Sequence, residues 1–143
     1  MRILISACLL GVRCRYDGGC KPCEAAIRLG DKHRLIPVCP EQLGGLSTPR
    51  TPCERKDGRV ITREGADRTD AYLLGAAQAE MLFDLLRCDC AVLKARSPMC
   101  GCGAVYDGTF TGTLVPGNGV LAEKLLERGI PVFTEENLPE TVK

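Results

Sequence analysis

The chain has 143 residues, 45% of them hydrophobic and 26% charged, so it can bury the core of one globular domain without disulfide bonds. We expect a single domain over residues 1–143. Its 19 basic and 18 acidic residues nearly cancel, which leaves no charge excess to attract nucleic acid or an anionic membrane. The unusual feature is the count of 10 cysteines. This density indicates metal or thiol chemistry in a cytosolic enzyme, and a disulfide framework in a secreted protein.

The N-terminal apolar run distinguishes a cytosolic protein from a secreted one. A secretory signal peptide needs roughly 7–15 apolar residues after a basic segment, and only seven residues precede Cys8. The apolar run over residues 3–12 is also shorter than the roughly 18 residues of a membrane span. We therefore expect a soluble cytoplasmic protein that has neither a membrane nor a nucleic acid as its partner.

The first half of the chain predicts a strand, a short helix, a second strand and a hairpin, at residues 2–8, 23–30, 34–40 and 54–65. The first strand is an almost continuous apolar run, which is typical of a strand buried on both faces. In the second strand Pro37 removes a backbone donor, so this strand should lie at an edge of its sheet. The hairpin is expected to turn at Asp57-Gly58, a dipeptide that favours tight turns.

The second half predicts a long helix from Thr69, a strand over 88–95, a hairpin over 104–114, a helix that ends before Gly129 and a last strand over 130–133. The Thr69 side chain can cap the long helix. The second hairpin is expected to turn at Asp107-Gly108. Apolar residues recur at the helical period along the long helix and predict its buried face, at Ala71, Leu74, Ala77 or Gln78, Met81, Leu82 and Leu85.

The alternation of strands and helices predicts the fold class. It indicates an α/β domain of the Rossmann-like or flavodoxin-like kind, with a mainly parallel sheet, helices on both faces and small hairpin insertions. Ligands in such folds bind beyond the carboxyl ends of the strands. Cys8 and Cys39 lie at the ends of the first two predicted strands, and Cys100 lies in the loop after the third. We therefore expect these three cysteines to converge at one rim of the sheet.

Three converging thiolates can hold three corners of an iron-sulfur cube and leave the fourth iron open to a substrate. Alternatively, Cys8 and Cys39 are small buried hydrophobic residues at strand ends, and position alone leaves both interpretations open. Four glycines beside the cysteines favour the first interpretation, because backbone that turns tightly around a bulky ligand needs glycine. These glycines are Gly11, Gly44, Gly45 and Gly101.

Four polar residues near these cysteines are candidates for catalysis or substrate binding. Glu41 can act as a general acid or base, or can be a solvated loop carboxylate. Ser97 can hydrogen-bond a substrate or cap a turn. Asp17 can bind substrate, but Asp17-Gly18 also favours a simple turn. Arg50 can hold an anion or face solvent. The sequence leaves each of these pairs of interpretations open.

A second metal site is indicated by the spacing Cys20-x-x-Cys23, which is half of a typical zinc site. The chain has only one such pair, and its single histidine lies ten residues further on. Two other functions therefore stay open beside a cluster enzyme. One is a non-catalytic zinc or metal-storage domain that uses Cys20 and Cys23 with Cys14 or Cys53, and the other is a sulfur carrier that relays persulfide.

Six blocks of the sequence together resemble a known family. They are Ser6 to Gly11, Arg15 to Gly18, Val38 to Glu41, Gly44 to Leu46, Pro49-Arg50 and Leu93 to Gly101. In this order they resemble a bacterial family, once described only as a domain of unknown function, that is typified by thiouracil desulfidase (2-thiouracil desulfurase). The resemblance spans nearly the whole chain, and the ordered set of blocks is specific.

The resemblance implies a compact α/β domain with a [4Fe-4S] cluster on Cys8, Cys39 and Cys100. It also implies that the free iron binds the sulfur of a thiocarbonyl group while water replaces that sulfur on the carbon. Glu41 is then expected to move protons, and Ser97 to orient the small thiolated substrate. One residue departs from the pattern, because Met99 replaces the second serine of the family's Ser-Pro-Ser-Cys-Gly motif. If that serine contacts substrate, the substrate of this protein differs from thiouracil.

Overall fold

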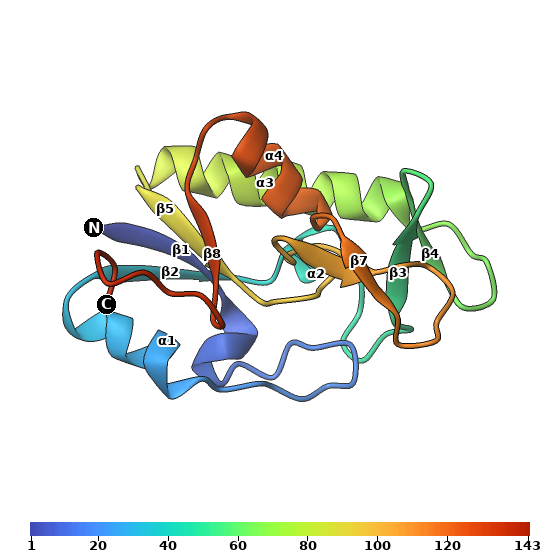
Figure 1. The fold of residues 1–143 in the computed structure, drawn as a ribbon, viewed down its shortest axis with the longest axis horizontal. Helices are drawn as coiled ribbons and strands as arrows, with labels where there is room; N and C mark the ends of the chain where they lie inside the picture. Colours follow the sequence, from blue (N-terminus) through green and yellow to red (C-terminus); the bar gives the residue numbers. More distant parts are fainter.

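The computed structural model describes residues 1–143, and its centre is a four-stranded parallel sheet (Figure 1). Its strands are β1 (Arg2–Ser6), β2 (Arg34–Val38), β5 (Cys90–Leu93) and β8 (Val132–Thr134). They lie in the order β2-β1-β5-β8, which is the order in which flavodoxin-like sheets begin. The predicted α/β class with a mainly parallel sheet is therefore confirmed. Strand β2 lies at one edge, as Pro37 predicts, and β1 is its only neighbour.

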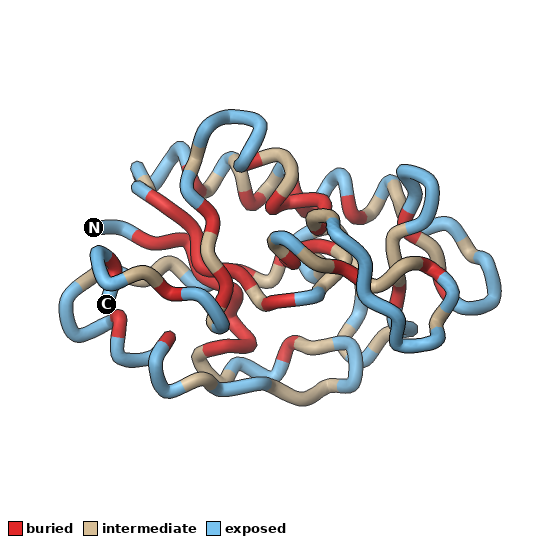
Figure 2. Tube along the Cα trace, in the orientation of Figure 1, coloured by how far each residue is buried: buried red, intermediate tan, exposed pale blue.

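The two inner strands pack against a separate core on each face of the sheet. Leu4 of β1 and Ala91 of β5 belong to a core of 17 buried residues on one side. Ile3 of β1 and Val92 of β5 belong to a core of 12 buried residues on the other side. Successive side chains of a strand point to opposite faces, so a strand that serves both cores must be apolar throughout. Figure 2 shows the resulting burial along the central strands.

Helices cover both faces (Figure 1). The larger core contains side chains of α3 (Thr69–Leu85) and α4 (Val120–Glu127). The smaller core contains side chains of α1 (Glu24–Arg28) and of the C-terminal segment, including Val142. The short helical turns are η1 (Ala7–Leu10), η2 (Leu29–Asp31) and α2 (Pro40–Leu43). None of the helices has the length and apolar character that crossing a bilayer requires.

Two hairpins extend the fold, as predicted. Strands β3 (Cys53–Lys56) and β4 (Arg59–Thr62) turn at Asp57-Gly58, where both residues have positive φ, as a type I′ turn requires. The second hairpin, formed by β6 (Ala104–Tyr106) and β7 (Leu114–Pro116), does not turn tightly at Asp107-Gly108. Its strands are joined by residues 107–113, because the Asp107 side chain accepts hydrogen bonds from Thr109 and starts a wider loop.

The predicted buried face of α3 is wrong. Leu74, Met81 and Leu85 are 51%, 50% and 69% exposed. The residues that are buried are Tyr72, Gly75, Ala76, Ala79 and Phe83. This face is rich in glycine and alanine, which carry little apolar area, so hydrophobic periodicity does not reveal it. The predicted cap is also wrong, because the Thr69 hydroxyl accepts a hydrogen bond from the Val60 amide at 3.0 Å and does not cap its own helix.

Small residues on this face allow α2 and α3 to touch through their backbones. A Cβ atom on Gly75 would lie 1.9 Å from the Pro40 carbonyl oxygen, and one on Gly44 would lie 2.1 Å from the Ala71 carbonyl oxygen. The structure thus gives Gly44 a different role from the one expected, since it faces a helix and makes no room for a ligand. The contact holds α2, which begins directly after Cys39, against a long and well-packed helix.

Candidate functional site

A cavity of about 540 Å³ lies at the carboxyl ends of the parallel strands. Its walls include Ser6 and Val38, the last residues of β1 and β2, and Lys94, the first residue after β5. Ligands bind at this end in open parallel sheets. Five cysteines line the cavity, namely Cys8, Cys14, Cys39, Cys53 and Cys100. The structure thus brings the three predicted ligand cysteines to one cavity and adds two more.

Each of the three predicted ligand cysteines lies in the segment that follows a strand of the parallel sheet. Strand β1 ends at Ser6, so Cys8 lies within η1. Strand β2 ends at Val38, so Cys39 is the N-terminal cap of α2. Cys100 lies in the loop after β5 and is buried, as is Cys8. Strands β1 and β2 both end earlier than predicted, because in each case the chain turns into a helix directly after the last sheet residue.

The thiols of these cysteines lie in a buried and electrostatically coupled group. Burial raises the pKa of Cys8 to about 11, and Glu41 adds to this shift while Lys94 opposes it. Burial raises the pKa of Cys100 well above its ordinary value, again with a contribution from Glu41. Burial and the neighbouring Cys39 thiol raise the pKa of Cys14 to about 12. The Cys8, Cys14 and Cys100 thiols are therefore neutral at pH 7, and a cation bound among them would favour their thiolate forms.

Glu41 and Arg50 form a buried ion pair in the cavity wall. Arg50 Nη2 donates to Glu41 Oε2 at 2.5 Å, and their side chains are 7% and 17% exposed. Burial raises the pKa of Glu41, and the Arg50 guanidinium opposes this shift. Arg50 also donates to the Cys14 carbonyl oxygen at 3.0 Å and to the Thr48 hydroxyl at 3.1 Å. Arg50 thus joins α2 to two loops, and a role in substrate binding stays a prediction.

Ser97 lines the cavity and also shapes the loop that carries Cys100. Its hydroxyl oxygen accepts hydrogen bonds from the amides of Met99 and Cys100, both at 3.1 Å. The hydroxyl proton is not used by these bonds, so it is available to donate to a bound molecule. Ser97 therefore combines both of the roles that the sequence left open, a turn cap and a candidate substrate contact.

Asp17 does not line the cavity. Its carboxylate accepts a hydrogen bond from the Gly19 amide at 2.9 Å, which is the turn that Asp17-Gly18 indicates. A role of Asp17 in substrate binding stays a prediction. Cys20 and Cys23 are partly exposed, and no group of three or more His, Cys, Asp or Glu side chains is arranged to hold a single metal ion. The zinc site at Cys20 and Cys23 stays a prediction.

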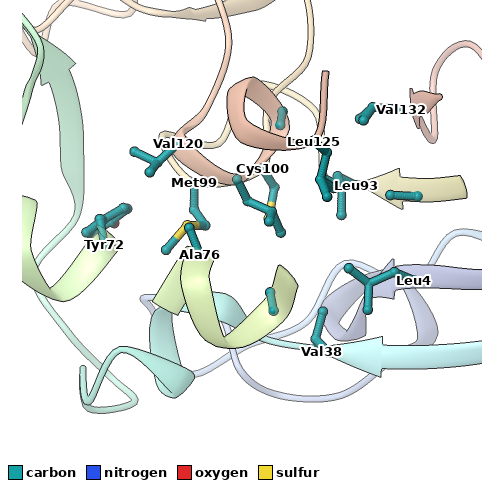
Figure 3. Close-up of a cluster of buried hydrophobic side chains, with 14 of the residues drawn as sticks. Leu4, Val38, Tyr72, Ala76, Leu93, Met99, Cys100, Val120, Leu125 and Val132 are labelled. Atoms are coloured by element: carbon teal, nitrogen blue, oxygen red, sulfur yellow. The ribbon is translucent and has the colours of Figure 1, made fainter. Parts of the chain in front are cut away.

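Met99 points into the core and does not line the cavity. Its side chain is fully buried, and Figure 3 shows it among core side chains next to Ala76 of α3. The neighbouring Ser97 and Cys100 do line the cavity, because successive residues of this tight loop face different ways. The replacement of a serine by Met99 therefore changes the core and leaves the cavity wall unaltered. It gives no reason to expect a different substrate.

The structure also places in the cavity wall residues that the sequence did not assign to this site, among them Cys14, Cys53, Tyr72 and Lys94. Lys94 forms an ion pair with Glu135 at 2.9 Å and lies near the end of the strand predicted over residues 88–95, so its position was a usable signal. Cys14 offers its carbonyl oxygen to the Cys39 thiol, at 3.6 Å. Neither Cys14 nor Cys53 follows a strand of the parallel sheet, and Tyr72 lies off the predicted helix stripe. Their convergence depends on loop packing that no local pattern encodes.

The fold and the cavity define a small α/β enzyme with a cysteine-lined site. The 2-thiouracil desulfurase family model matches residues 3–137, and the chain belongs to this family. It is 38% identical to YbbK, an uncharacterised protein of Bacillus subtilis (strain 168), over 95% of this chain and 97% of that protein. It is also similar to a solved structure described as [4Fe-4S]-dependent thiouracil desulfidase TudS. The two share 42% identity with a TM-score of 0.91, over 97% of this chain and 93% of that chain.

Proposed function

We propose that this protein is a [4Fe-4S]-dependent desulfidase that removes sulfur from the thiocarbonyl group of a small thiolated nucleobase or related thioamide. One observation carries the proposal: Cys8, Cys39 and Cys100 come from three separate segments and line one cavity at the ends of the sheet. Membership of the 2-thiouracil desulfurase family and the similarity to a [4Fe-4S]-dependent thiouracil desulfidase support it.

The donor set fits an iron-sulfur cluster. Cys8, Cys39 and Cys100 supply three sulfur ligands, the ligand type that holds such clusters. The buried Cys8 and Cys100 thiols need a nearby positive charge to ionise, and bound metal would supply it. The Ser6 side chain opposes the rise in the pKa of Cys100, which also favours the thiolate. We therefore assign the cluster to these three cysteines.

When bound, the cluster supplies an iron without a cysteine ligand, a Lewis acid that prefers soft sulfur to oxygen. Glu41 takes the proton from the water that attacks the thiocarbonyl carbon, and it does so at Oε1 because Arg50 holds Oε2. Ser97 orients the substrate through its free hydroxyl proton. The net change replaces C=S by C=O and turns water into hydrogen sulfide, so the reaction consumes no electrons.

Anaerobic reconstitution followed by iron and sulfide analysis tests the proposal. We expect about four irons per chain and a coloured protein that releases sulfide from 2-thiouracil. Cys100→Ala should lose both the iron and the activity. Cys88→Ala is the matched control, because Cys88 lies outside the cavity, and it should keep both. A colourless wild-type protein without iron would overturn the proposal, and zinc bound in its place would favour a metal-storage domain.

A further inference from the structure

Tyr72 is a buried polar residue that the proposed reaction does not yet use. Its side chain is part of the larger core and only 3% of the residue is exposed. Its hydroxyl makes no hydrogen bond to a nitrogen or oxygen of the chain. No side-chain oxygen of the protein is both fully shielded from solvent and without a hydrogen-bond partner. The Tyr72 hydroxyl therefore borders on open space. Tyr72 lines the cavity, and so do Glu41, Cys53 and Arg50, the groups that act electrostatically on its hydroxyl, so the hydroxyl is the part of the side chain that faces this space. A strong hydrogen-bonding group is thus directed at the site where a substrate would lie.

The α2–α3 contact places this hydroxyl beside the candidate catalytic residue. Tyr72 lies about one helical turn before Gly75, which touches Pro40 of α2. Glu41 follows Pro40 and contributes to the electrostatic environment of the Tyr72 hydroxyl, as does Cys53 from the start of β3. In Figure 3 Tyr72 lies at one end of the drawn core residues, away from Leu93 and Leu125. The ring fills the core, while the hydroxyl belongs to the cavity.

The fold itself gains little from this hydroxyl. The nearby Cys53 thiol is a weak hydrogen-bonding partner. A buried hydroxyl without a good partner costs stability, so phenylalanine would suit the same core position better. A polar molecule in the cavity would supply the missing partner. The oxygen therefore has a use only when the cavity is filled.

The geometry points to Tyr72 as a substrate-positioning residue, whose hydroxyl donates a hydrogen bond to an oxygen or nitrogen of the substrate outside its thioamide group. This inference rests on the proposed function. Burial raises the pKa of Tyr72, and Glu41 and Cys53 add to the shift, so the phenol keeps its proton and remains a donor at any ordinary pH. With Glu41 facing the same cavity, the hydroxyl fixes the ring orientation that presents the thiocarbonyl carbon to water.

Tyr72→Phe tests the inference, since it removes one oxygen and keeps the ring in the core. We expect unchanged iron content, a Tm equal to or slightly above that of wild type, a KM for 2-thiouracil raised about 3- to 10-fold, and a kcat within about twofold of wild type. Thioacetamide has no acceptor outside its thioamide group, so its KM should not change. Phe83→Leu is the control for a purely structural effect: Phe83 lies on the same helix face away from the cavity, so this variant should lower Tm and leave KM unchanged.

Two results would overturn the inference alone. The first is an active Tyr72→Phe enzyme with a wild-type KM for 2-thiouracil, and the second is an equal rise in KM for 2-thiouracil and thioacetamide. A cluster-loaded wild-type protein that releases no sulfide from either compound would overturn the proposed function and this inference with it. Failure of the inference and failure of the proposed function therefore give different results.

Discussion

Replacing Gly75 by alanine should destabilise the protein, although the same change in the middle of a helix ordinarily stabilises it by about 1 kcal/mol. The added Cβ would lie 1.9 Å from the Pro40 carbonyl oxygen and 3.2 Å from the Gly44 amide nitrogen. Carbon and oxygen normally meet at about 3.5 Å, so α2 and α3 would have to separate by roughly 1.5 Å. The added Cβ is fixed to the backbone of α3 and meets only backbone atoms of Pro40 and Gly44, so no flexible side chain can move aside.

The expected magnitude follows from these two opposing effects. Overpacking costs about 1–3 kcal/mol, and a clash between two backbones belongs at the upper end of that range. After the gain in helix propensity, the net loss is about 2 kcal/mol, which corresponds to a fall in Tm of about 5–10 °C for a domain of this size. Because Cys39 directly precedes Pro40, the displacement should also lower the iron content of the reconstituted protein.

Thermal unfolding followed by circular dichroism measures the effect. Gly30→Ala is the matched control, because its Cβ would lie 3.4 Å from the Leu35 side chain, an ordinary contact. It should change Tm by less than about 3 °C. A Gly75→Ala protein whose Tm equals or exceeds that of wild type would refute the backbone contact between α2 and α3.

Three further predictions address single residues. Glu41→Gln should keep the iron and lose most sulfide release, because the amide cannot take a proton; unchanged release would remove Glu41 from the mechanism. Met99→Ser should lower the free energy of unfolding by about 3 kcal/mol, since it leaves a void in the core, and should leave the KM for 2-thiouracil within about twofold; a changed KM at unchanged Tm would place residue 99 at the cavity. Burial raises the pKa of Cys90 from its ordinary value of 9.0 to about 11. The unfolded chain therefore loses this proton first, and the free energy of unfolding should fall between about pH 9 and pH 11. Urea titrations should show a smaller fall for Cys90→Ala, and an equal one would contradict the shift.

The parallel sheet could be predicted from the sequence because its inner strands are buried on both faces. Such strands must be apolar at every position, so β1 and β5 appear as continuous apolar runs. The edge position of β2 also has a local cause, the missing donor of Pro37. The placement of Cys8, Cys39 and Cys100 followed from the same reasoning, because residues that follow parallel strands meet at one end of the sheet.

The face of α3 could not be predicted for a physical reason. The hydrophobic effect depends on apolar area, and the large side chains of Leu74, Met81 and Leu85 dominate any periodicity that is counted along the helix. The side that packs against α2 is selected by close approach, which requires Gly75 and excludes leucine. Tyr72 therefore escaped notice, although it faces the candidate site. Shape, and not hydrophobicity, orients this helix.

The distribution of the cavity cysteines between the two cores has a consequence for biosynthesis. Cys8 belongs to the core on one side of the sheet and Cys100 to the core on the other. The ribosome must therefore deliver the chain beyond residue 100, and both layers must close, before the proposed ligands can meet. Metal delivery is then a late step that acts on a nearly finished domain. In the cell, iron supply would decide how long each newly made molecule waits in an inactive, thiol-rich form.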